Sequence, residues 1–274
     1  KIFQYHIEKS MLKQIRTIKW LFLLKGKNYI KSLNRQFPHI EPSSKLNSCH
    51  FYLNKTTELT IDSECYLRNV KIFAFSGTNK IYIGKNTKIS DCIIIANNGN
   101  ITIGKNNIIQ KSDDSFQTKF QVDNGSLRIG DYNRISCVIW IRFGGLVEIG
   151  SRNAINQRTE IRADEKITIG DYNQISYDCV IWDTNTHNIY TAEKRREITD
   201  KQYPAFGLEY EKPKTSPVAI GNDCWIGRRV SILKGTSIGD KCVIAFNTTL
   251  SKQQLRPNST VMNSYNLIIK ENEL

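Results

Sequence analysis

Residues 217–250 read PVAIGNDCWIGRRVSILKGTSIGDKCVIAFNTTL and carry an aliphatic residue at every sixth position. A period of six matches neither the 3.6 residues of a helical turn nor the two-residue alternation of a single strand. It predicts short strands joined by turns, with one aliphatic side chain of each strand pointing inward. The members of this series are Ile220, Ile226, Ile232, Ile238, Ile244 and Leu250.

The same spacing extends over most of the chain. The glycines of successive Ile-Gly pairs, from Gly84 to Gly239, are separated by 20, 26, 20, 20, 51 and 18 residues. Three six-residue sides make a coil of about 18 residues, and stacked coils bury a continuous aliphatic ladder. The step of 51 hides one long excursion over about 184–216. We therefore predict a mainly β chain folded as a parallel β-helix, with the Gly, Asn and Asp after each Ile at turn positions of positive φ.

The segment before these repeats is predicted to be helical, because apolar residues from Met11 to Ile30 recur at helical spacing. It holds nine Lys and Arg and one Glu, so it carries +8 of the net charge of +13. Two interpretations are open: a cap on the end of the solenoid, or a basic amphipathic helix on an anionic membrane face or assembly complex. The predicted organisation is 1–37 basic amphipathic helical segment, 38–57 linker, 58–256 β-helix domain and 257–274 C-terminal tail.

Composition narrows the class of protein. With 39 Lys and Arg against 26 Asp and Glu, the chain favours an anionic partner. The sequence contains no recognised nucleic-acid-binding motif, and most of the excess positive charge lies in the first 37 residues. Both observations weaken the interpretation that the anionic partner is a nucleic acid. The seven Cys form no CxxC pair, so we expect reduced core thiols in a cytoplasmic protein, without a disulfide framework or a metal site. The run Trp20–Leu24 is far too short to span a bilayer.

Chemistry is expected where the repeat is broken, because a solenoid core is inert. His187 is the single histidine of the repeat region and stands at the start of the long excursion, four residues after Asp183. Histidine suits proton transfer near neutral pH. Asp183 is a candidate to orient the imidazole or to bind an acceptor, and the alternative is an ordinary turn residue.

Four features follow one another along the chain: Asp183-Thr-Asn-Thr-His187, a long loop, Trp225-Ile-Gly227, and the hexads from Ile232 to Ile244. In this series the sequence resembles the hexapeptide-repeat acyltransferases, closest to the sugar and polysaccharide O-acetyltransferases. The resemblance implies a left-handed β-helix, a homotrimer, and acetyl-CoA bound between neighbouring subunits. It also implies that His187 is the general base and that Trp225 lines the site. The alternative for Trp225 is a packing residue under the loop.

The resemblance and the local residue types suggest further site residues. Asn156 and Asp164 align with acceptor-contacting residues of the family, and each is also a plausible turn residue. Arginines on the coils before His187 suit a carboxylate or phosphate on the acceptor, or else form a solvated basic face. The candidate acceptor-binding residues are Asn156, Asp164, Arg142, Arg158, Arg162 and Asn185. The candidate CoA-binding residues are Gly227, Arg228, Ala245, Phe246, Lys252 and Arg256.

The expected function is acetyl-CoA-dependent O-acetylation of a sugar hydroxyl in a capsular polysaccharide or lipopolysaccharide, by a cytoplasmic enzyme that contacts the inner membrane or an assembly complex through 1–37. Two alternatives stay open: N-acetylation of an amino sugar, and a non-catalytic β-helix scaffold. A scaffold would need neither His187 nor the loop beside it. A carbonic-anhydrase-like zinc site needs three histidines, and the repeat region has one.

Overall fold

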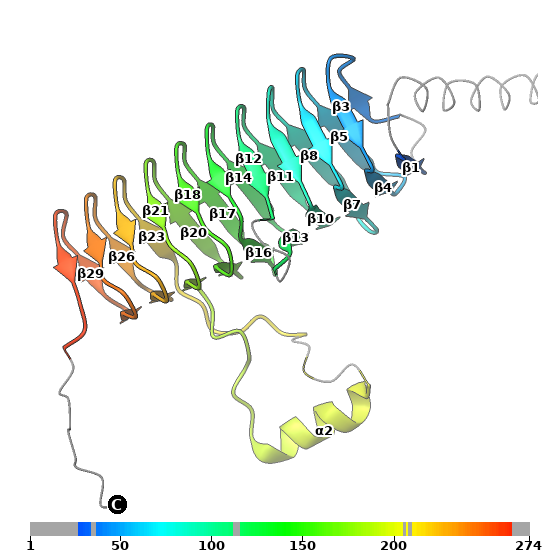
Figure 1. Cartoon of the computed structure of the whole chain (residues 1–274). Coiled ribbons are helices and arrows are strands. Elements are labelled where there is room, and N and C mark those ends of the chain that lie inside the picture. Colours follow the sequence, from blue (N-terminus) through cyan, green and yellow to red (C-terminus); the bar gives the residue numbers. More distant parts are fainter. Residues whose placement is uncertain (1–26, 34–36, 112–115, 205–206, 208–209, 265–274) are drawn as a thin grey trace, which may run out of the picture.

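The computed structural model describes residues 27–33, 37–111, 116–204, 207 and 210–264, and there the strands form three parallel sheets wound into one three-sided β-helix (Figure 1). Consecutive strands belong to sheets A, B and C in turn, so each circuit of the chain adds one strand to every sheet. The predicted parallel β-helix is confirmed, and its arrangement agrees with the left-handed form that the resemblance implied.

Each sheet contains ten strands. Sheet A consists of β1 (Tyr29–Ser32), β4 (His50–Leu53), β7 (Lys71–Ala74), β10 (Cys92–Asn97), β13 (Thr118–Asp123), β16 (Val138–Ile141), β19 (Glu160–Ala163), β22 (Val180–Trp182), β25 (Ser231–Leu233) and β28 (Thr249–Ser251). Sheet B consists of β2 (His39–Ile40), β5 (Thr57–Ile61), β8 (Asn79–Ile83), β11 (Asn100–Ile103), β14 (Ser126–Ile129), β17 (Leu146–Ile149), β20 (Lys166–Ile169), β23 (Val218–Ile220), β26 (Ser237–Ile238) and β29 (Gln254–Leu255). Sheet C consists of β3 (Lys45–Asn47), β6 (Tyr66–Arg68), β9 (Lys88–Ser90), β12 (Ile108–Gln110), β15 (Arg134–Ile135), β18 (Ala154–Ile155), β21 (Gln174–Ile175), β24 (Trp225–Ile226), β27 (Val243–Ile244) and β30 (Thr260–Val261).

The six-residue period produces the core directly. In sheet C, Ile155, Ile175 and Ile226 are register partners on successive coils, and each is almost fully buried. Burial of one such side chain is worth about 1.5–3 kcal/mol relative to exposure. All seven cysteines are buried and free, as predicted for core thiols.

The glycine of each Ile-Gly pair has a different role from the predicted one. A Cβ on Gly150 would lie 2.7 Å from the carbonyl oxygen of Gly170 on the next coil, so these glycines allow stacked backbones to approach closely. The positive φ falls two residues later, at Arg152 and Tyr172 among others. The prediction of positive φ at the Ile-Gly glycines was therefore wrong, and that for Asn and Asp holds at positions such as Asn106 and Asp223.

The β-helix extends beyond the predicted boundaries at both ends. Strand β1 pairs with β4, and β2 pairs with β5, so coils begin inside the segments expected to be helix and linker. At the other end β30 pairs with β27, so the last coil includes part of the expected tail. Residues 1–26, which hold most of the predicted basic helix, lie outside the described residues.

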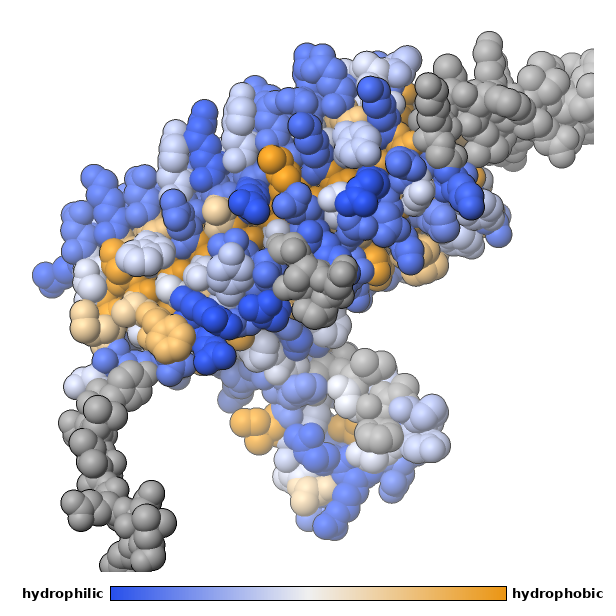
Figure 2. Space-filling view, in the orientation of Figure 1, coloured by the Kyte–Doolittle hydropathy of each residue, from blue (hydrophilic) through white to orange (hydrophobic). Residues whose placement is uncertain are grey.

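One long excursion breaks the solenoid between β22 and β23, as predicted. We call residues 184–216 the arm. It contains α2 (Ala192–Gln202), a helix with no buried residue among those described, whose N-cap Thr191 accepts a hydrogen bond from the N–H of Lys194. The arm projects from the side of the β-helix (Figure 1), and its surface in the space-filling view is mostly hydrophilic (Figure 2).

Candidate active site

The arm leaves and rejoins the body at one corner of the triangular section, where strands of sheet A turn into sheet B. We call this the A–B corner. An isolated antiparallel bridge between Thr184 and Thr215 joins the two ends of the arm, and the N–H of Ser216 donates to the Asp183 carbonyl. These contacts hold the root of the arm on the solenoid, and His187 follows directly.

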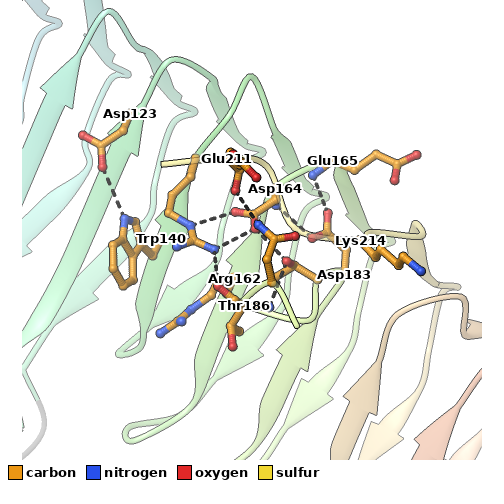
Figure 3. A network of polar contacts seen from close by, with 12 residues as sticks. Asp123, Trp140, Arg162, Asp164, Glu165, Asp183, Thr186, Glu211 and Lys214 are labelled. Carbon is orange, nitrogen blue, oxygen red and sulfur yellow. Dashed lines mark hydrogen bonds and ion pairs between the residues drawn. The ribbon is translucent and has the colours of Figure 1, made fainter. Parts of the chain in front are cut away.

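Asp183 is fully buried in this root, and its carboxylate accepts hydrogen bonds from the backbone of the preceding coil (Figure 3). Its Oδ1 accepts the N–H of Asp164 at 2.8 Å, and its Oδ2 accepts the N–H of Glu165 at 2.9 Å. Burial raises the pKa of Asp183 to about 6, and these backbone hydrogen bonds act in the opposite direction. Asp183 thus fixes the turn beneath the arm through both of its carboxylate oxygens.

Asp164 and Arg142 form a buried ion pair at the same corner, with side-chain exposures of 0% and 12%. The guanidinium donates from Nε and Nη2 to the two carboxylate oxygens at 2.8 and 2.7 Å. Thr184 Oγ1 also donates to Asp164 Oδ2 at 2.6 Å, and Arg142 Nη2 reaches the Thr186 carbonyl at 3.3 Å. Both residues were predicted to bind the acceptor, and the structure shows each with partners inside the chain.

The other two candidate arginines are paired as well. Arg162 lies between the rings of Trp140 and Trp182, at 4.6 and 5.0 Å from the ring centroids, and donates to Glu160. Arg158 pairs with Asp178, which also accepts from Arg228. The pKa of Asp178 is lowered, mainly by the hydrogen bond from Arg158. Desolvation acts in the opposite direction, and the hydrogen bond from Arg228 lowers the pKa further.

Asn156 and Asn185 are separated in the structure. Asn156 lies at the corner between sheets C and A, where its Nδ2 donates to the Ile175 carbonyl at 3.1 Å. Asn185 lies in the arm root, where its N–H donates to the Lys214 carbonyl. The structure therefore brings Asn185, Asp164 and Arg142 together near His187, and places Asn156 and Arg158 elsewhere.

A cavity of about 380 Å³ lies within the arm, and His187 is in its wall. Tyr190 donates from its hydroxyl to Glu211 at 2.9 Å, and Lys194 Nζ lies 3.8 Å from the same carboxylate. The sequence motifs did not predict these arm residues, because the excursion was expected to be a loop, although their position beside His187 was a usable signal. The remaining described lining residues are Arg195, Ile198, Thr199, Gln202, Gly207 and Tyr210.

The residues predicted to bind CoA gather mainly at the corner between sheets C and A, which we call the C–A corner. Trp225 on β24 is 61% exposed, and Phe246 on the following coil is 56% exposed. A Cβ on Gly227 would lie 2.8 Å from the Phe246 backbone nitrogen, so this glycine allows the two coils to stack closely at the corner.

Of the remaining residues predicted to bind CoA, two lie at the C–A corner and two lie at other corners. Arg228 and Ala245 share the C–A corner with Gly227, and Arg228 is paired with Asp178. Lys252 lies in the turn between β28 and β29 at the A–B corner, and Arg256 lies in the turn between β29 and β30. Within one chain, His187 follows the C-terminal ends of the sheet A strands, whereas Trp225, on β24 of sheet C, lies near the corner that precedes their N-terminal ends.

Comparison with known proteins agrees with the repeat. Residues 217–252 match the family model described as bacterial transferase hexapeptide (six repeats). A "Probable acetyltransferase" of Mycobacterium tuberculosis is 32% identical over 119 residues, 43% of this chain and 33% of that protein. A "Probable macrolide acetyltransferase" of Lysinibacillus sphaericus is 36% identical over 93 residues, 31% of this chain and 52% of that protein. The chain thus spans a third to about half the length of these curated relatives.

Two solved structures resemble the chain at 19% identity and a TM-score of 0.41. They are the polySia specific acetyltransferase NeuO (86% of this chain, 90% of that chain) and the polysialic acid O-acetyltransferase OatWY (89% and 92%). Together with the hexapeptide match, the relatives confirm the resemblance to the hexapeptide-repeat acyltransferases.

Two kinds of feature are absent from the described residues. In that part of the chain no group of three or more His, Cys, Asp or Glu is arranged to hold a metal ion. No helix there combines the length and apolar character needed to cross a membrane.

Proposed function

We propose that the protein is an acetyl-CoA-dependent O-acetyltransferase that acetylates a sugar hydroxyl, in a capsular polysaccharide or lipopolysaccharide, on the cytoplasmic side of the membrane. The observation that carries this proposal is the position of His187. It stands in the wall of the arm cavity, directly after a root anchored to the β-helix by Asp183 and Asp164. A base at the mouth of a cavity suits an acceptor hydroxyl held there.

The chemistry follows from these positions. His187 takes the proton of the acceptor hydroxyl while the hydroxyl oxygen attacks the thioester carbonyl carbon. The carbonyl oxygen becomes an oxyanion, which backbone N–H groups of the loop edge stabilise. The carbon–sulfur bond then breaks, CoA leaves as a thiolate, and the imidazolium returns the proton to it. The products are the acetyl ester and free CoA.

Two copies of the chain complete one site in this proposal. His187 is at the A–B corner, whereas Trp225 and Phe246 are exposed at sheet C and the C–A corner. A homotrimer, which the resemblance implies, would set the A–B corner of one subunit against the C–A corner of the next. Acetyl-CoA would then lie on the Trp225 surface, with its thioester facing the arm of the neighbour.

Acetyl-CoA turnover tests this function. The acceptor panel contains neutral and acidic polysaccharides, an amino sugar, and a macrolide, since one relative is named for that acceptor. Sugar hydroxyl acetylation that is lost in His187→Ala supports the proposal. Acetylation of the amine instead selects the N-acetyltransferase alternative, and absence of acetyl-CoA binding in calorimetry selects the scaffold. Wild-type turnover by His187→Ala refutes the base assignment.

Mixing two inactive variants tests the shared site. Equal amounts of His187→Ala and Trp225→Ala, unfolded and refolded together, should form mixed trimers in which one of the three subunit contacts combines an intact His187 with an intact Trp225, so about a quarter of all contacts in the mixture are restored. Activity should reappear in the mixture and not in either variant alone. No recovery in trimers shown by mass to be mixed would contradict a site shared between subunits.

A further inference from the structure

The hydrogen bonds of the buried pair Arg142–Asp164 lead to Thr186, the residue before His187. Arg142 comes from the turn after β16, and Asp164 from the turn after β19, on the neighbouring coil. Both turns are at the A–B corner. The pair therefore ties two coils of the rigid solenoid together directly beneath the arm (Figure 3).

Thr186 is the residue that this pair controls. Its φ is 65°, in the left-handed region, which is uncommon for a β-branched residue and has to be held by surrounding contacts. Its carbonyl accepts from Arg142 Nη2 at 3.3 Å, and its N–H donates to Thr184 Oγ1 at 3.0 Å. The same Thr184 hydroxyl donates to Asp164 at 2.6 Å. Both polar groups of the Thr186 backbone are thus tied to the ion pair.

The hydrogen bonds of the pair converge on Thr184 and Thr186. Asp164 accepts two bonds from Arg142 and one from Thr184, and its side chain is fully buried. A buried ion pair contributes little net stability, because desolvation offsets the Coulomb attraction. Its effect is directional: the bidentate geometry fixes the guanidinium, and the guanidinium fixes the Thr186 carbonyl. The position of the next Cα, that of His187, follows.

We infer that Arg142 and Asp164 are positioning residues that hold His187 at the mouth of the arm cavity, rather than ligands of the acceptor. This inference rests on the proposed function, in which His187 is the general base. A displacement of about 1 Å at a reacting group lowers the rate by on the order of 10²-fold. We therefore expect that breaking the Arg142–Asp164 pair lowers kcat by about 10–100-fold and leaves the KM for the acceptor little changed.

The decisive experiment is a double-mutant cycle between Arg142 and His187. We compare Arg142→Ala, His187→Ala and the double variant for kcat and for the KM of the acceptor. If Arg142 acts only through His187, the double variant is no slower than His187→Ala alone, because Arg142 then has no base left to position. If Arg142 binds acceptor, the two losses multiply and KM rises in Arg142→Ala; that outcome overturns the inference.

A matched control and a rescue separate positioning from general damage. Arg128 and Glu148 also link neighbouring coils through an arginine–carboxylate contact of 2.8 Å, on the exposed face of sheet B, so Arg128→Ala should keep wild-type kcat. Methylguanidinium added at a non-denaturing concentration should restore part of the kcat of Arg142→Ala and none of that of His187→Ala. Absence of rescue in folded Arg142→Ala, as judged by circular dichroism, counts against the inference.

Asp164→Asn provides a second variant if Arg142→Ala does not fold. Its amide keeps one acceptor oxygen for Thr184 or Arg142 and loses the bidentate contact, so kcat should fall while the fold is kept. Wild-type kcat in this variant would overturn the inference. The proposed function fails separately: if His187→Ala keeps wild-type turnover, the base assignment is wrong whatever Arg142 and Asp164 do.

Discussion

Replacing Asn153 by valine should destabilise the β-helix strongly, whereas threonine at the same position should not. Asn153 is 2% exposed, in the turn before β18, and it bridges to the next coil. Its Oδ1 accepts the N–H of Asn173 at 2.8 Å, and its Nδ2 donates to the Gly170 carbonyl at 2.9 Å. Threonine and valine have nearly the same shape, so the two variants differ by the single hydroxyl that can replace these bonds.

The structure already shows threonine in this role. Thr87 occupies the equivalent turn of an earlier coil, accepts the N–H of Asn107 at 3.2 Å and donates to the Gly104 carbonyl at 2.8 Å. Asn153→Thr should therefore cost less than about 1 kcal/mol. Valine leaves a buried N–H and a buried carbonyl without these partners, at about 1–3 kcal/mol each. The expected difference between the two variants is about 3 kcal/mol.

Thermal unfolding at one fixed protein concentration measures this difference. A loss of 1 kcal/mol lowers Tm by about 2–4 °C in a domain of 150–250 residues, so Asn153→Val should melt about 6–12 °C below Asn153→Thr. Hydrogen exchange reports the site itself, since the amide of Asn173 should lose protection in the valine variant alone. Equal melting temperatures and equal protection of that amide would refute the reasoning from buried hydrogen bonds.

Two further predictions concern the same corners of the solenoid. Gly170→Ala places a Cβ 2.7 Å from the Gly221 carbonyl oxygen and against Asn222 Oδ1, so it should lower the unfolding free energy by about 2 kcal/mol in a denaturant titration; unchanged stability would show that the coils can separate. Burial raises the pKa of Asp183 to about 6, so the folded chain favours the protonated acid. Unfolding free energy should therefore fall as pH rises from about 4 to 7, by up to about 3 kcal/mol relative to Asp183→Asn, and parallel pH profiles of the two proteins would contradict this.

The fold was predictable because its signal is repeated. One buried aliphatic residue every six positions is imposed by the three-sided section, and many coils repeat the constraint. The turns carry less information, because Tyr172, Arg152 and Asp223 all occupy the same positive-φ position on different coils. The extent of the solenoid was underestimated at both ends, since strands such as Tyr29–Ser32 are recognised by pairing with the next coil rather than by their own pattern.

The candidate site was predictable in location and less so in detail. The break in the repeat predicted the arm, because insertions in a solenoid fall at corners, and the structure places His187 in the wall of the arm cavity. Side-chain partners were not predictable, since residues about 20 positions apart become neighbours only after coiling. The arginines illustrate this: Arg142 was assigned to an acceptor carboxylate, and the structure supplies that carboxylate from Asp164 in the chain itself.

This pairing also bears on the charge of the acceptor. Arg142, Arg158 and Arg162 each pair with a carboxylate of the chain, although Arg158 shares Asp178 with Arg228, so none of them by itself requires an anionic sugar. The cavity beside His187 contains Lys194 and Arg195 with Glu211, which leaves one net positive charge among these three groups. Discrimination between neutral and acidic acceptors, if it occurs at this cavity, should therefore depend on the arm rather than on the arginines of the β-helix.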